Sequence, residues 1–81
     1  MPYYAYILEC ADKTYYTGST DNIYGRAAEH NEGRGAEYTK RRRPVKLVYY
    51  EEFGNRSLAM KRERELKKLS RQDKKKLVES R

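Results

Sequence analysis

The chain has 81 residues and a formal net charge of +7, from 19 Lys and Arg against 12 Asp and Glu. A chain of this length forms one domain with a small core, so we expect a single domain over residues 1–81. Its one cysteine excludes an internal disulfide, and its longest uncharged stretch near the start is too short to span a membrane. No segment resembles a signal peptide, so we expect a cytoplasmic protein.

The positive charge is concentrated in the second half of the chain. Lys13 and Arg26 are the only Lys or Arg among residues 1–33, which also hold five acidic residues. In a small domain, such a basic excess favours a polyanionic partner, above all nucleic acid. The alternative is that the charge serves solubility alone, and charge by itself does not decide between the two.

The first predicted element is a β-hairpin. Tyr3–Cys10 and Thr14–Thr20 are rich in aromatic and β-branched residues, and Asp12 between them can hydrogen-bond its own backbone in a tight turn. Because only a short turn joins the two strands, they must pair antiparallel.

Alternation along these strands places Tyr6 and Tyr16 on the same face of the sheet. We expect the two rings as a cross-strand pair. Gly18 lies two residues after Tyr16, and a glycine within a strand often marks the close approach of a ligand or another backbone. The alternative is that the tyrosines are ordinary strand residues over a small core.

A helix is predicted over residues 22–31, capped by Asp21 or Thr20. Arg26 and His30 are four residues apart and therefore project from one face of this helix. Residues 32–44 read as a polar loop, in which Gly33 and Gly35 stop the helix.

The second half predicts a third strand over Val45–Phe53, a helix from Ser57 and a short final helix capped by Ser70. Two apolar stripes are open for the longer helix. One holds Leu58, Arg62, Leu66 and Leu69, and the adjoining one holds Ala59, Glu63 and Leu66. The order β-β-α-β-α-α predicts an α+β fold.

The polar residues of these elements, Tyr6, Tyr16, Arg26, His30 and Glu63, would together suffice for metal-assisted phosphodiester hydrolysis. An inward carboxylate such as Glu63 needs a cation as its partner, and a hard cation such as Mg²⁺ is held by one carboxylate with waters and phosphates. Arg26 suits a phosphate, while tyrosine and His30 transfer protons. The alternative is that helical Glu and Arg form solvated faces, with Glu63 paired to a nearby Lys or Arg.

The order of these motifs resembles a GIY-YIG nuclease domain of the small stand-alone bacterial type. Tyr4-Ala5-Tyr6 and Tyr16-Thr17-Gly18 stand where the family has its two name-giving motifs, and Arg26 and His30 have its Arg-x-x-x-His spacing. The segment Ala59–Lys67 is similar to the helix that carries the metal-binding glutamate. Thr17 departs from the usual isoleucine, and Tyr4 from the usual glycine.

The resemblance implies a three-stranded antiparallel sheet flanked by helices and an endonuclease that hydrolyses DNA with Mg²⁺ or Mn²⁺. Glu63 would bind the metal, and Arg26 would hold the scissile phosphate. Tyr16 or Tyr6 would act as general base or position the attacking water, with His30 orienting a tyrosine or assisting proton transfer. Glu65 is the weaker metal candidate.

Nucleic-acid contacts are expected from the basic loop, at Arg34, Tyr38, Lys40, Arg41, Arg42 and Arg43. Lys and Arg would contact phosphates, and Tyr38 could stack on an exposed base of single-stranded or structured DNA. The alternative for the loop is a solvated, mobile segment. Two alternatives to the nuclease stay open: a non-catalytic nucleic-acid-binding module on the same fold, and an adaptor that recruits partners through its basic surface.

Overall fold

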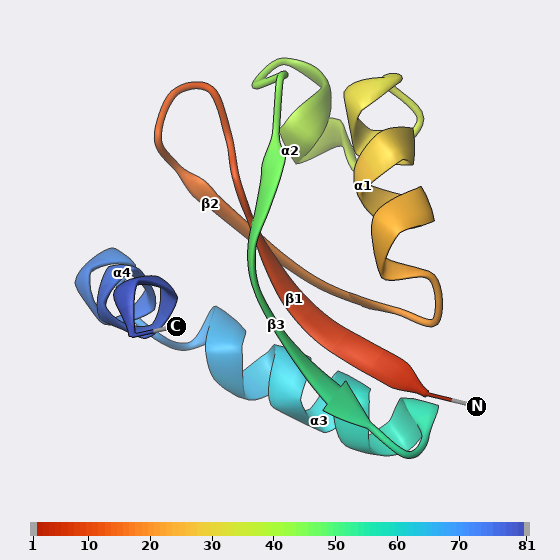
Figure 1. Ribbon diagram of the computed structural model, residues 1–81. Coiled ribbons are helices and arrows are strands. Elements are labelled where there is room, and N and C mark those ends of the chain that lie inside the picture. Colours follow the sequence, from red (N-terminus) through yellow and green to blue (C-terminus); the bar gives the residue numbers. More distant parts are fainter. Residues whose placement is uncertain (1, 81) are drawn as a thin grey trace.

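The computed structural model describes residues 2–80 as a three-stranded antiparallel sheet with helices on both faces (Figure 1). In chain order the elements are β1 (Tyr3–Glu9), β2 (Tyr15–Thr20), α1 (Ile23–Asn31), α2 (Glu37–Lys40), β3 (Lys46–Phe53), α3 (Arg56–Lys67) and α4 (Arg71–Glu79). This confirms the predicted α+β class and the predicted order, with α2 as an addition. The strand order β2-β1-β3 puts β1 at the centre and leaves β2 at an edge.

The hairpin turn forms as predicted, but its register differs. Asp12 accepts hydrogen bonds from the Thr14 amide at 3.2 Å and the Thr14 hydroxyl at 2.6 Å. Tyr6 pairs with Gly18 and Leu8 with Tyr16, so the predicted cross-strand pair of Tyr6 and Tyr16 is wrong. The turn is centred on Asp12, and this shifts the pairing by two residues. The two tyrosines are diagonal neighbours on one face.

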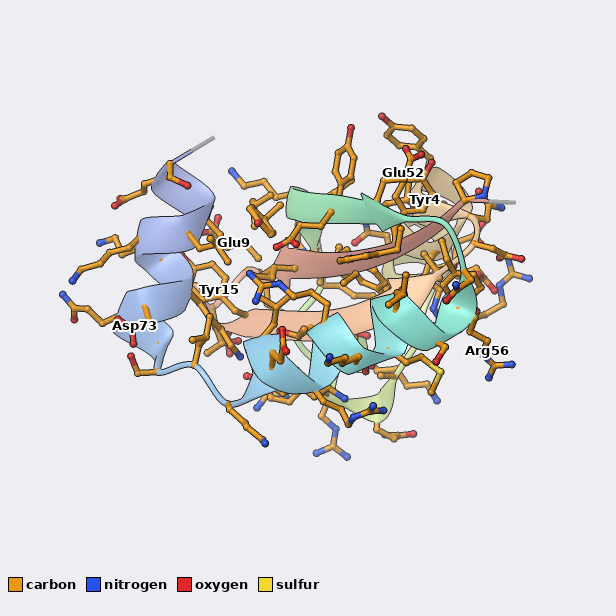
Figure 2. All side chains as sticks on the ribbon, turned by 90° about the horizontal axis from the view of Figure 1, so that it is seen from below. Tyr4, Glu9, Tyr15, Glu52, Arg56 and Asp73 are labelled. Atoms are coloured by element: carbon orange, nitrogen blue, oxygen red, sulfur yellow. The ribbon has the colours of Figure 1, made fainter. Side chains whose placement is uncertain are left out.

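A small core lies on each face of the sheet. Under α1, the buried cluster consists of Tyr6, Leu8, Cys10, Ile23 and Val45. Under α3, the alternate residues of the strands are buried against Ala59 and Leu66, both 0% exposed. Figure 2, which is seen from below, shows α3 lying over the sheet, roughly along its strands, and Tyr15 next to α4.

The loop predicted over residues 32–44 contains a single helical turn, α2. The Ala36 carbonyl accepts from the amides of Thr39 and Lys40, which closes this turn. Four residues are too few for a helical periodicity to show in the sequence, so the prediction missed the element. The turn buries Thr39, which is 0% exposed.

The helix caps correct two predicted boundaries. Asn22 rather than Asp21 or Thr20 caps α1, because its side chain accepts from the Gly25 amide at 3.2 Å. Asn55 caps α3, so this helix starts one residue before Ser57. The Ser70 cap of α4 is confirmed by its 3.1 Å bond from the Asp73 amide.

Of the two stripes on α3, the one with Glu63 faces the sheet. Ala59 and Leu66 are fully buried, whereas Leu58 is 48% exposed and Arg62 pairs with Glu51 beyond the core. Within residues 2–80, no helix has the length and apolarity needed to cross a membrane.

Candidate active site

A chain of hydrogen bonds links β1, α1 and α2 inside the face under α1. The Tyr6 hydroxyl lies 3.3 Å from His30 Nε2, and His30 Nδ1 lies 2.7 Å from Thr39 Oγ1. The Thr39 hydroxyl donates its single proton to the Ala36 carbonyl at 2.9 Å, so it accepts from His30 Nδ1. Nε2 of the neutral ring is then the acceptor for the Tyr6 proton.

Arg26 lies beside the Tyr6 hydroxyl and can only donate to it. Burial raises the pKa of Tyr6 to about 12, with the Arg26 guanidinium opposing and the Tyr16 and Glu63 side chains adding to the increase. Burial, and then the positive charge of Arg26, lower the pKa of His30. At neutral pH the tyrosine is therefore protonated and the histidine uncharged.

Gly18 makes room for this arrangement. A Cβ atom at Gly18 would lie 2.5 Å from the Tyr6 hydroxyl oxygen and 2.7 Å from its ring carbon Cζ. The close approach predicted at this glycine is thus made by the Tyr6 ring, and neither a ligand nor another backbone is needed to explain it.

Tyr16 is half-buried and differs from Tyr6 in having an open hydroxyl. Its ring lies 5.2 Å from the His30 ring and 6.1 Å from the ring of Tyr38, on which it stacks. No hydrogen bond to its hydroxyl is found among residues 2–80, and its side chain lines a cavity together with Lys67. Of the two tyrosines, Tyr16 is the one that can reach a bound molecule.

Glu63 reaches the edge strand β2 from the opposite face of the sheet. Its Oε1 accepts from the Ser19 hydroxyl at 2.6 Å, and its Oε2 pairs with Lys67 Nζ at 2.8 Å. Burial acts to raise the pKa of Glu63, but the bonds from Lys67 and Ser19 outweigh it and the pKa is lowered. Glu63 is therefore a charged carboxylate, with only 17% of its side chain exposed.

This carboxylate fits the chemistry of a hard divalent cation. Residues 2–80 contain no group of three or more His, Cys, Asp and Glu that could hold a metal. A site here would therefore consist of one carboxylate, waters and substrate phosphate oxygens, as Mg²⁺ often accepts. Each Glu63 oxygen keeps a second lone pair beyond its present bond. Glu65, with 51% of its side chain exposed, pairs with Arg62 at 3.2 Å.

The basic loop is largely occupied by contacts within the chain. Arg42 pairs with Asp12 at 3.1 Å and lies 3.9 Å above the Tyr38 ring. Arg43 donates to the carbonyls of Lys40 and Asn31, while Lys40 pairs with Glu37 and Arg34 with Glu32. Arg41 is exposed and has no such partner within residues 2–80. Contacts of these residues with nucleic acid stay a prediction.

Two residues that contact the candidate site residues, Thr39 and Ser19, escaped the sequence reasoning. Thr39 lies in a segment predicted as loop, and Ser19 and Glu63 are 44 residues apart, so neither contact has a local signal. The ion pair of Glu63 with Lys67 is the alternative that the sequence offered for this glutamate, since a distance of four residues is that of a helical ion pair.

The sheet, the two tyrosines, the Arg and His on α1 and the glutamate on α3 define a recognised class of domain. The model of the GIY-YIG catalytic domain matches residues 2–77, and the chain belongs to this family. The family is a nuclease superfamily.

Within it, the chain is similar to small UPF0213 proteins. It is 54% identical to one from Staphylococcus haemolyticus over 98% of this chain and 96% of that protein, and 54% identical to one from Natronomonas pharaonis over 94% and 89%. The solution NMR structure of the UPF0213 protein from Bacillus halodurans aligns with a TM-score of 0.63 at 43% identity, covering 100% of this chain and 86% of that one.

Proposed function

We propose that this protein is a metal-dependent endonuclease that hydrolyses DNA phosphodiester bonds. The observation that carries the proposal is the chain from Tyr6 through His30 to Thr39, with Arg26 and the Glu63 carboxylate close enough to shift the pKa of Tyr6.

In this proposal, Glu63 holds Mg²⁺ or Mn²⁺, which would supply positive charge against the phosphate and lower the pKa of a bound water. Arg26, with 35% of its side chain exposed, binds the scissile phosphate through its guanidinium. The open side chain of Tyr16 positions the attacking water, and its phenolate form, which lacks the hydroxyl proton, takes up the proton that this water loses. Tyr6 and His30 are positioning residues, since the Tyr6 hydroxyl is already committed to the buried ring.

One observation favours the alternative of a binding module with little or no turnover. The ion pair of Glu63 with Lys67 occupies the carboxylate that a metal would need. A metal must displace or share this lysine, and a weak metal site would leave a protein that binds DNA without cutting it.

The test is an incubation of the protein with single-stranded, duplex and branched DNA in Mg²⁺, Mn²⁺ or a chelator. We expect cleavage that needs the metal. In Glu63→Gln, which keeps the shape and the Ser19 bond, cleavage should be lost while DNA binding, measured with a chelator present, is nearly unchanged. Binding without cleavage under every metal condition would favour the binding module, and a Glu63→Gln variant that cuts normally would refute the site.

A further inference from the structure

A cavity of about 220 Å³ lies at the edge of β2, next to the candidate active site. Four elements contribute to it, and its lining consists of Tyr15, Tyr16, Thr17, Tyr38, Lys67 and Lys74. A second cavity of about 190 Å³ shares Tyr15, Tyr38 and Lys74 with it and continues to Arg71 on α4. The two form a path from the open hydroxyl of Tyr16 along α4, which lies beside the start of β2 in both views (Figures 1 and 2).

Thr17 lines this cavity and carries a hydroxyl without a hydrogen-bond partner among the described residues. Thr17 is only 3% exposed. In the part of the chain that the structure describes, its Oγ1 is the one buried side-chain oxygen or nitrogen without a hydrogen-bond partner. An unpaired buried hydroxyl destabilises a protein, so a polar group here without a structural partner points to a ligand.

Lys74 brings an unpaired positive charge to the same cavity. It is half-buried, and no carboxylate within residues 2–80 forms an ion pair with it. Burial and the nearby ammonium of Lys67 both lower its pKa. Two lysines that face one cavity repel each other, and an anion between them would remove both the repulsion and the loss of solvation.

We propose that this cavity binds a backbone phosphate of a single nucleic-acid strand, adjacent to the scissile phosphate, through Lys74 and the Thr17 hydroxyl. The inference rests on the proposed nuclease function, because Tyr16 borders both sites. Lys67 would join these donors if a metal bound to Glu63 displaced it from its ion pair. The continuation of the cavity toward Arg71 gives the strand its direction, away from the catalytic residues along α4.

Binding is measured by fluorescence anisotropy of a labelled 12-residue oligothymidine in chelator, where no cleavage takes place. Lys74→Gln should weaken binding about tenfold and reduce the slope of log affinity against log salt by about 0.7. Lys76→Gln is the matched control, since it removes the same charge from an exposed position on the same helix that lines neither cavity. We expect it to change the affinity less than twofold.

Thr17→Val separates a ligand contact from a structural role. Valine keeps the shape and removes only the unpaired hydroxyl, so the urea midpoint of unfolding should stay equal or rise, while oligothymidine affinity falls about tenfold. A structural hydroxyl would give the opposite result, with a lower midpoint and unchanged affinity.

Competition by inorganic phosphate distinguishes a strand from a free anion. If inorganic phosphate abolishes the difference between the unmodified chain and Lys74→Gln at concentrations as low as the dissociation constant of oligothymidine, the cavity is a site for free phosphate and the proposal is overturned. Equal affinities of Lys74→Gln and Lys76→Gln also overturn it, even if the unmodified chain cleaves DNA. Conversely, if the chain never cleaves but the two variants differ as expected, the strand site stands and the nuclease proposal fails.

Discussion

The substitution Thr39→Val should impair the candidate active site, although Thr39 itself touches no substrate. The substitution removes Oγ1, the acceptor 2.7 Å from His30 Nδ1, while valine preserves the shape of the side chain. Two outcomes are open to the buried ring. Its Nδ1 proton can stay without a partner, or the proton can move to Nε2, which then no longer accepts from Tyr6.

The magnitude follows from the burial of the groups involved. His30 and Thr39 are both 0% exposed, so a donor left unpaired there lowers the free energy of unfolding by about 1–3 kcal/mol. Moving the proton to Nε2 instead gives up the bond to Tyr6, whose net contribution is about 0.5–1.5 kcal/mol. In serine proteases, loss of the carboxylate that fixes the histidine tautomer lowers kcat about 10⁴-fold. For loss of the neutral Thr39 hydroxyl, we expect the cleavage rate to fall about 10- to 100-fold.

The assay combines three measurements on Thr39→Val: urea unfolding, single-turnover cleavage with Mg²⁺, and the ¹⁵N spectrum of the imidazole. His30 is the only histidine in the chain, so its two ring nitrogens are assigned without ambiguity. Thr39→Ser restores the acceptor and should recover the wild-type tautomer and most of the activity. An Nδ1-protonated ring with normal cleavage in Thr39→Val would refute the reasoning.

Three further predictions follow from the same geometry. Tyr16→Phe should fold with unchanged stability and lose roughly 10²–10⁴-fold in cleavage rate, because only the open hydroxyl is removed; near-normal rates would exclude Tyr16 as the general base. Gly18→Ala should lower the free energy of unfolding by about 1–3 kcal/mol and reduce cleavage, because its Cβ would lie 2.5 Å from the Tyr6 oxygen. Gly54→Ala, where nothing lies within 4 Å of the added carbon, is the control and should change neither. The folded state lowers the pKa of His30, so on acidification the imidazole of the unfolded chain takes up a proton first. The stability due to His30 is therefore complete above about pH 6.5 and falls at lower pH, by at most about 1.4 kcal/mol per pH unit. The Cε1 proton resonance of His30 should titrate below pH 6.5, and a midpoint at or above 6.5 would contradict this.

Local patterns in the sequence were enough to predict the elements and to nominate several residues of the candidate site. The hairpin, the third strand and three of the helices follow from residue alternation, helical periodicity and capping residues, which act within a few positions along the chain. The helical spacing of Arg26 and His30 and the place of Glu63 on an inward stripe also follow from such local patterns. The two candidate stripes on α3 could not be separated, because only the packing of Ala59 and Leu66 against the sheet decides between them.

The tertiary structure decided the contacts that give the site its chemistry. The turn at Asp12 sets the register that brings Tyr6 over Gly18, and a single turn of helix carries Thr39 to His30. The cavity at the edge of β2 draws on four elements, so the unpaired hydroxyl of Thr17 and the unpaired charge of Lys74 have no signature in the order of residues. Such contacts depend on how whole elements pack, and packing is set by the summed burial of many side chains rather than by neighbours along the chain.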